Sequence, residues 1–271
     1  VGAPRESKVL GVPPGNPPLE YALSTERAGE LADVTLMMPE GLATKEYKKD
    51  AEQAVYDLVI YDRCRPESMP QSNTLFIGRL PPTEEWKGDK PAKSIVAPQI
   101  IDIDRSHPLV QLLDLSELVI AEGIALDPPP ASATLLDSNQ GKLLVVAPRG
   151  EFEDAVLGME LVGSDEKGVV FANTNWPLRL SFPTFVLGVL EYLGGNRGAD
   201  FTASVRPGQS VRLRSRSAAA ELAITRPDGK IERVPRGSGG FYDFHATDVV
   251  GIYEVREGNK AMQRFAVNLC D

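Results

Sequence analysis

One apolar segment near residue 190 divides this chain into two parts of different character. The run Phe185–Leu193 is mainly apolar and is followed by Gly194 and Gly195, residues that readily end a helix. Before this run, apolar strand patterns alternate with helical patterns, whereas after Asn196 the chain consists of short strand patterns and turns. The sequence therefore predicts an α/β domain that closes with a buried helix, followed by a small all-β domain.

The first part begins with an alternation of strand and helix patterns. Apolar runs with the length of buried strands occur at Lys8–Val12, Asp33–Met38, Asp57–Tyr61 and Thr74–Ile77. Helical spacing is found at Leu19–Leu31, with Asn16 as a candidate N-cap, and at Thr44–Val55, with Thr44 as N-cap. This order predicts a doubly wound, flavodoxin-like parallel sheet.

The region 99–163 is less regular. Ala133–Leu136, Lys142–Ala147 and Ala155–Leu161 have strand patterns without helices between them. We therefore expect an antiparallel or mixed extension of the sheet, after which a helix over Phe182–Leu193 closes the domain. Within the segment before this helix, we expect Trp176 and Arg179 to be packing anchors, with Arg179 bonding to carboxylates or loop carbonyls.

The second part shows period-two alternation separated by turn sequences such as Pro227-Asp-Gly. Short strands are predicted at Phe201–Val205, Val211–Leu213, Glu221–Thr225, Ile231–Val234, Phe241–Phe244, Gly251–Val255 and Arg264–Val267. Such a series is typical of a small immunoglobulin-like β-sandwich. We thus expect an α/β domain over residues 1–197 and a β-sandwich over residues 198–271.

The charge of the chain argues against one class of partner. The net charge is −9, and nucleic-acid binding needs a basic surface, so we expect no nucleic-acid partner. The acidity belongs to residues 1–197, which carry 18 Lys and Arg against 29 Asp and Glu. Arg212, Arg214 and Arg216 alternate along one predicted strand of the β domain and form a solvated face suited to an acidic partner.

No apolar run reaches the roughly 20 residues that span a bilayer. The chain starts at Val1 rather than Met, so we expect it to be part of a longer protein whose membrane or targeting segments lie elsewhere. Its two cysteines, Cys64 and Cys270, fall in different predicted domains, and we expect no disulfide between them.

Cys64 is the one thiol placed where a nucleophile could lie, directly after the strand Asp57–Tyr61. Arg63 and Arg65 beside it could lower its pKa. A nucleophile elbow, however, needs small neighbours, and these arginines and Pro66 are bulky or conformationally restricted. The sequence favours a loop cysteine without a catalytic role.

A second candidate is His107, which lies close to Asp102 and Asp104. This combination could orient a general base or bind a metal ion. His107-Pro108 is more typical of a turn in which the imidazole bonds to a backbone group, so we predict no metal site.

The loop Gly11–Asn16 follows the first strand, where open α/β sheets place phosphate-binding turns. Pro13 and Pro14 lack the backbone N–H groups that hold phosphate, and the loop has no G-x-G-x-x-G pattern. We therefore predict no nucleotide and no other cofactor.

Several segments together resemble a known family, the region C-terminal to the von Willebrand factor A domain in bacterial aerotolerance (BatA-like) membrane proteins. They are VYDLVIYDRCRPESMPQSNTLFIG (55–78), DRSHPLVQLLDLSELVIAE (104–122), NTNWPLRLSFPTFVLGVLEYL (173–193), VRPGQSVRLR (205–214), DVVGIYEVREG (248–258) and FAVNLCD (265–271). The resemblance implies a class I glutamine amidotransferase-like domain, a β-sandwich, and transmembrane helices elsewhere in the parent protein. The amidotransferase pattern, Gly-x-Cys-x-Gly with a distant His-x-Glu, has no match here, so no catalytic residue carries over.

The leading hypothesis is a non-catalytic portion of a membrane-anchored protein, on the extracytoplasmic side, that acts as a scaffold or interaction module for other proteins. The alternative is a cysteine-dependent hydrolase or amidotransferase-like enzyme with Cys64 as nucleophile, His107 as base, and Asp102 or Asp104 as orienting group. A third hypothesis is a small ligand bound at the carboxyl ends of the strands Lys8–Val12 and Asp57–Tyr61.

Overall fold

The computed structural model describes residues 7–87, 93–150, 152–164, 170–195, 203–214, 220–236, 241–258 and 260–268. The chain divides into two compact units, of which the first is Arg5–Asn196 and the second contains Val1–Pro4 and Arg197–Asp271. The end of the first unit at Asn196 lies one residue before the predicted domain boundary at 197/198. Cys270 and Arg216 lie outside the described residues.

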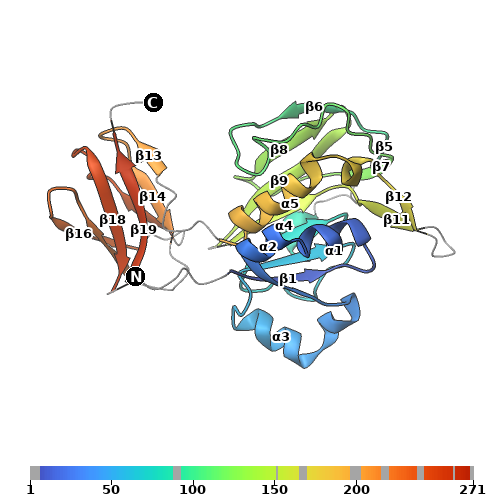
Figure 1. The fold of residues 1–271 in the computed structure, drawn as a ribbon, viewed down its shortest axis with the longest axis horizontal. Coiled ribbons are helices and arrows are strands. Elements are labelled where there is room, and N and C mark those ends of the chain that lie inside the picture. The colour runs from blue at the N-terminus through green and yellow to red at the C-terminus, as the bar shows by residue number, and fades with distance from the viewer. Residues whose placement is uncertain are drawn as a thin grey trace. The chain divides into compact units, whose positions relative to one another are not determined.

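The first unit contains a mixed eight-stranded sheet in the order β2-β1-β3-β4-β10-β9-β8-β6 (Figure 1). Its strands are β1 (Ser7–Val12), β2 (Ala32–Leu36), β3 (Leu58–Asp62), β4 (Asn73–Ile77), β6 (Ile100–Ile103), β8 (Ala133–Ser138), β9 (Gly141–Arg149) and β10 (Phe152–Leu157). Neighbours from β2 to β10 pair in parallel, and β9, β8 and β6 follow as antiparallel neighbours. The predicted α/β fold with a mixed extension is confirmed.

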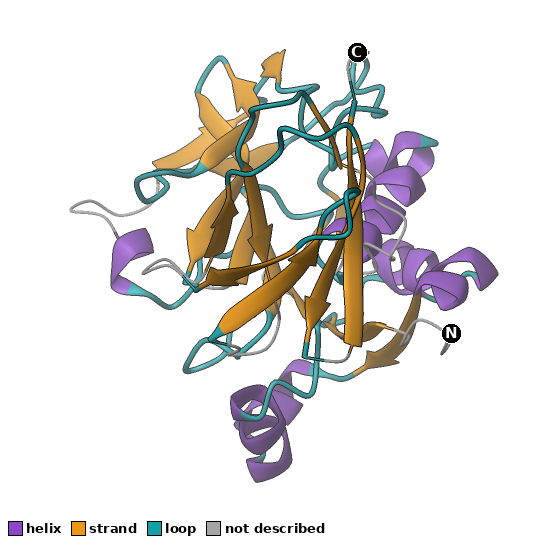
Figure 2. Ribbon diagram, turned by 90° about the vertical axis from the view of Figure 1, so that its left-hand side faces the viewer, coloured by secondary structure: helices purple, strands orange, loops and turns teal. Residues whose placement is uncertain are grey.

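Helices cover both faces of this sheet. α1 (Pro17–Leu23), α2 (Glu26–Leu31) and α5 (Ser181–Tyr192) lie together on one side, which we call the α5 face (Figures 1 and 2). The 3₁₀ helix η1 (Pro39–Ala43) and α3 (Lys45–Glu52) lie on the other, the α3 face. Smaller elements complete the unit: α4 (Glu84–Lys87), η2 (Trp176–Leu178), and the strand pairs β5 (Lys93–Val96) with β7 (Glu122–Ala125) and β11 (Val162–Ser164) with β12 (Val170–Ala172).

The central strands are buried from both sides, which explains their continuous apolar sequence. Every residue of β3 is buried. Its Leu58 and Ile60 belong to the core of the α5 face, and Val59 and Tyr61 to the core of the α3 face. The alternation of side chains along a strand produces these two separate cores.

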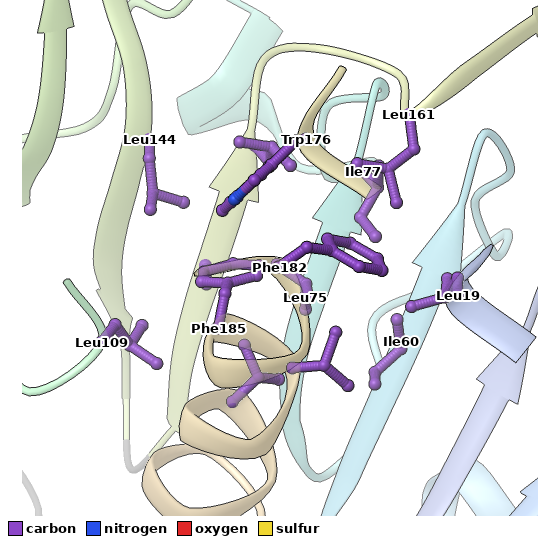
Figure 3. Packing of buried hydrophobic residues seen from close by; sticks show 14 of the residues in the cluster. Leu19, Ile60, Leu75, Ile77, Leu109, Leu144, Leu161, Trp176, Phe182 and Phe185 are labelled. Carbon is purple, nitrogen blue, oxygen red and sulfur yellow. The ribbon is translucent and has the colours of Figure 1, made fainter. Parts of the chain in front are cut away.

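The closing helix is held by an aromatic group. Trp176 is wholly buried, and its ring lies 4.9 Å from Phe185 and 5.8 Å from Phe182 between ring centroids (Figure 3). Its indole N–H donates to Ser181 Oγ at 3.1 Å. Arg179 donates to Glu117 Oε2 at 2.5 Å and to the Glu117 carbonyl at 3.2 Å. Both predicted anchors therefore have the expected role.

The single helix predicted over Leu19–Leu31 is wrong, because the structure contains two. Asn16 Oδ1 accepts the backbone N–H of Leu19 at 3.3 Å and caps α1, as expected. The chain then leaves the helix at Ser24, and Thr25 adopts an extended backbone whose Oγ1 accepts the N–H of Ala28 at 3.2 Å. A second N-cap inside an apolar periodic pattern thus starts α2.

The second unit is an all-β structure. A five-stranded sheet has the order β13-β19-β18-β15-β16, and β14 pairs with β17. The strands are β13 (Ala203–Val205), β14 (Val211–Arg214), β15 (Glu221–Thr225), β16 (Ile231–Pro235), β17 (Phe241–Phe244), β18 (Gly251–Glu257) and β19 (Lys260–Val267). All seven predicted strands are found, and their core includes Tyr253 stacked on Phe265 at 4.8 Å. Among the described helices of the whole chain, none combines the length and apolar character needed to cross a membrane.

Candidate functional site

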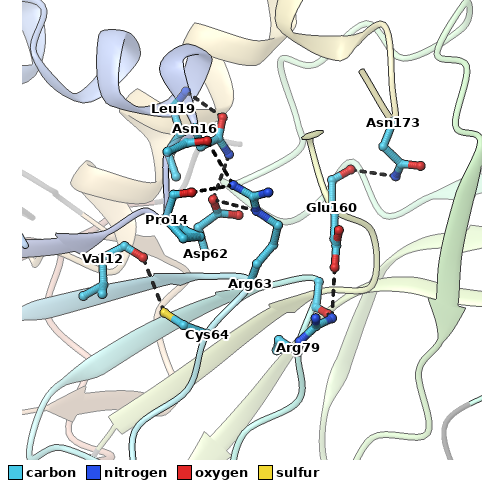
Figure 4. Close-up of polar contacts among 12 residues, drawn as sticks. Val12, Pro14, Asn16, Leu19, Asp62, Arg63, Cys64, Arg79, Glu160 and Asn173 are labelled. Atoms are coloured by element: carbon cyan, nitrogen blue, oxygen red, sulfur yellow. Dashed lines mark hydrogen bonds and ion pairs between the residues drawn. The ribbon is translucent and has the colours of Figure 1, made fainter. Parts of the chain in front are cut away.

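The carboxyl ends of β1 and β3 meet in the middle of the parallel half of the sheet, where open α/β folds place ligand sites. β3 ends at Asp62, and the turn after β1 leads to Asn16 at the start of α1. These residues and the polar groups around them form the candidate site (Figure 4).

Asp62 is the most unusual group of the site because its carboxyl is fully buried. Oδ2 accepts hydrogen bonds from Asn16 Nδ2 at 3.0 Å and from Arg63 Nε at 3.4 Å. Oδ1 has no hydrogen-bond partner among the described residues. Burial raises the pKa of Asp62 above its usual range, although the bonds from Asn16 and Arg63 act in the opposite direction.

Arg63 connects the end of β3 to the turn after β1. Its Nη2 donates to the carbonyl oxygens of Pro14 at 3.3 Å and Gly15 at 3.1 Å. Its backbone has a φ of 52°, a left-handed conformation that is rare for a bulky residue. The guanidinium is thus engaged with backbone carbonyls and the neighbouring carboxyl.

Cys64 lies in an environment that disfavours the thiolate form. Its Sγ donates to the carbonyl of Val12 at 3.4 Å, as Figure 4 shows. Burial, and secondly the charge of Asp62, raise the pKa of the Cys64 thiol to about 12, and the lowering by Arg63 is smaller. The sequence suggested that arginines could lower this pKa, but the desolvation of the thiol outweighs them.

His107 and Asp104 belong to a turn, as the sequence favoured. His107 Nδ1 accepts the N–H of Leu109 at 3.3 Å, and its ring lies 4.7 Å from that of Tyr192 in α5. Asp104 Oδ1 accepts from the hydroxyl of Ser106 at 2.5 Å and from its N–H at 3.1 Å, and these bonds lower the pKa of Asp104. Asp102 is exposed on β6.

The structure does not bring Cys64 and His107 together. Cys64 packs against the core of the α3 face, which contains Tyr47 and Tyr61. His107 contacts Tyr192, which packs against the core of the α5 face. The sheet therefore lies between the two candidate catalytic side chains.

A further set of polar side chains lies near the carboxyl ends of β4 and β10. Arg79 Nη1 donates to Glu160 Oε1 at 2.9 Å, and the charge of Glu160 is one of the effects that raise the pKa of Asp62. Asn173 Nδ2 donates to the carbonyls of Glu160 at 2.8 Å and Glu122 at 2.9 Å (Figure 4). Within the described part of the chain, no three His, Cys, Asp or Glu side chains are placed to hold a metal ion.

The sequence identified Asn16 as an N-cap. It did not identify Asp62, or the hydrogen bonds by which Arg63 joins the end of β3 to the turn after β1. The available signal was a charged residue directly after an apolar strand, at the carboxyl end where parallel sheets bind ligands. Its pairing with Asn16 depends on β1 and β3 being neighbours, which the order of the elements alone does not specify.

Comparison with known proteins gives a likeness in fold. A family described as a domain of unknown function (DUF8816) matches residues 203–267, and no curated protein matches the chain. A cytoplasmic protein from Salmonella typhimurium is similar in structure, with a TM-score of 0.50 and 11% identity over 69% of this chain and 98% of its own. At that identity the likeness shows the fold alone.

Two further solved structures are similar at lower scores. A cytoplasmic protein from Salmonella typhimurium LT2 has a TM-score of 0.49 and 13% identity over 69% of this chain and 99% of its own. A protein from Parabacteroides merdae ATCC 43184, described as ThuA-like, has a TM-score of 0.45 and 14% identity over 71% of this chain and 91% of its own.

Proposed function

We propose that this chain is a non-catalytic interaction module within a membrane-anchored protein. One observation carries the proposal: polar side chains at the strand ends form hydrogen bonds with the backbone of the chain itself. Cys64 donates to the Val12 carbonyl, and Arg63 donates to the carbonyls of Pro14 and Gly15. Such groups hold the turn in place and are not available to activate a substrate.

The resemblance of residues 55–78 and 173–193 to BatA-like proteins supports the membrane-anchored setting. In this proposal the partners are other proteins, and the chain lies on the extracytoplasmic side of the membrane. The acidic balance of residues 1–197, with 18 basic and 29 acidic side chains, favours partners with a basic surface.

The test is an assay of the full chain with glutamine, p-nitrophenyl acetate and p-nitrophenyl phosphate as amide, ester and phosphoester substrates. We expect no turnover above that of the Cys64→Ala variant, with thermal unfolding of both proteins as the control for folding. Turnover of any of these substrates that disappears in the Cys64→Ala variant would overturn the proposal.

The unpartnered oxygen of Asp62 supports a second candidate, the binding of a small polar ligand with a hydrogen-bond donor at the carboxyl ends of β1 and β3. A buried carboxyl oxygen without a partner costs free energy that such a donor would recover. This candidate predicts that some member of a metabolite library raises the melting temperature of the chain but not that of the Asp62→Asn variant. A library without any stabilising member would reject it.

A further inference from the structure

Among the described residues, the eight-stranded sheet ends at β6. This strand is the last of the sheet and pairs with β8, and no other described strand pairs with it. An edge strand presents backbone N–H and C=O groups to which a further strand can pair. β6 is therefore a place where an extended chain could continue the sheet.

A surface groove of about 820 Å³ lies against this strand. All residues from Gln99 to Ile103 line it. Because side chains alternate between the two faces of a strand, a groove that contacts every residue follows the edge rather than one face. Residues 115–119 form a second wall of it.

The second wall, residues 115–119, is fixed in place by side chains of the segment before α5. Asn175 Oδ1 accepts the N–H of Val119 at 2.9 Å, and Asn175 Nδ2 donates to the carbonyl of Glu117 at 3.0 Å. Arg179 holds the Glu117 side chain through the ion pair described above. The groove is therefore formed before any partner arrives, which reduces the entropy lost on binding.

The walls differ from an ordinary surface in two respects. Ile101 on one wall and Val119 on the other are apolar but 66% and 64% exposed. The carboxylate of Asp102 makes no hydrogen bond or ion pair with any of the described residues, whereas Arg105 donates to the Leu113 carbonyl and Arg179 binds Glu117. Arg179 pairs with Glu117, and the charge of Arg105 acts on Asp114. Asp102 is therefore the lining carboxylate that no cation of the described residues compensates.

We propose that β6 binds an extended segment of a partner protein as an added strand of the sheet. The segment carries apolar side chains that cover Ile101 and Val119, and a Lys or Arg that pairs with Asp102. Backbone pairing supplies the affinity, and these side chains supply the selectivity. The inference rests on the proposed interaction function and names the surface that performs it.

The test selects peptides from a displayed library of random decapeptides on the full chain. We expect the enriched peptides to alternate apolar residues with Lys or Arg, and to slow amide hydrogen exchange in residues 100–103 when bound. Ile101→Lys and Asp102→Lys should each weaken binding by about tenfold or more. Ile252→Lys is the matched control, because Ile252 is 63% exposed on β18 in the other unit.

Three outcomes would overturn this site: no enriched peptide, enriched peptides that bind the Ile101→Lys variant as tightly as the control, or binding without slower exchange in residues 100–103. Each would leave the non-catalytic role intact with another surface as its interface. The proposed function itself fails only if the substrate assays detect turnover that depends on Cys64.

Discussion

Cys64 lies between two arginines in the sequence, yet its thiol is half-buried and its pKa is raised to about 12, first by burial and then by Asp62. At pH 8 such a thiol is ionised in roughly one molecule in ten thousand, and only the thiolate reacts as a nucleophile. In a Cys270→Ser background, iodoacetamide should label Cys64 at least about ten times more slowly than it labels glutathione at pH 8. The measurement is mass spectrometry over time, and labelling as fast as that of glutathione would contradict the assigned environment.

Asp62 should make the stability of the protein depend on pH. Its pKa is raised in the folded state by burial, so the folded protein holds this proton in a pH range where the unfolded chain has lost it. Stability from this group is present at low pH and is lost as the pH rises through the folded pKa. The melting temperature of the Asp62→Asn variant, relative to the native protein, should therefore rise as the pH increases from about 4, the usual Asp pKa.

The control is Asp114→Asn. Bonds from Ser116 lower the pKa of this exposed carboxyl, so its contribution is lost as the pH falls and the relative melting temperature should change in the opposite direction. Asp154 is another buried acid with a raised pKa. It is present in every protein compared, so its contribution to the differences in melting temperature cancels. A constant difference between the Asp62→Asn variant and the native protein across the pH range would contradict the prediction.

At the scale of elements, the buried strands were predictable, whereas the short strands β6 and β7 were not. β3 is buried along its whole length and so has a continuous apolar sequence. β6 and β7 are half-exposed and only 4 residues long each, which is too short for a continuous or an alternating apolar pattern to identify a strand. The division between α1 and α2 was missed because the cap at Thr25 leaves the apolar spacing of the helical pattern unchanged. The candidate site was predictable in position but not in composition, since Asp62 meets Asn16 only through tertiary pairing.

The closing helix α5 should depend on its buried aromatic residues for stability. Phe185 is 2% exposed and contacts Trp176, whereas Leu178 in η2 is 90% exposed. Phe185→Ala should lower the free energy of unfolding by about 3–5 kcal/mol, through lost burial and the cavity left behind. Leu178→Ala, the matched control, should change it by no more than about 0.5 kcal/mol. Urea unfolding measures both, and equal effects would show that the helix is not anchored as described.

At the scale of the whole molecule, the two units have separate cores. The clusters of the first unit contain residues from Val9 to Leu193, and the cluster of the second contains residues from Val205 to Val267. A unit with its own core can unfold as a cooperative body, and a smaller one buries a smaller share of its surface. The chain should therefore unfold in two thermal transitions, with the second unit melting at the lower temperature.

The first unit, Arg5–Asn196, produced alone provides the decisive comparison. The core of this unit contains no residue of the second unit. Calorimetry should therefore find a single transition within about 3 °C of the upper transition of the full chain. A difference of about 3 °C is smaller than the change in melting temperature that the loss of one good contact produces. The lower transition should be absent from this shorter protein, which assigns it to Arg197–Asp271. A shorter protein that melts without cooperativity, or well below the upper transition, would mean that the β unit is required to stabilise the α/β sheet.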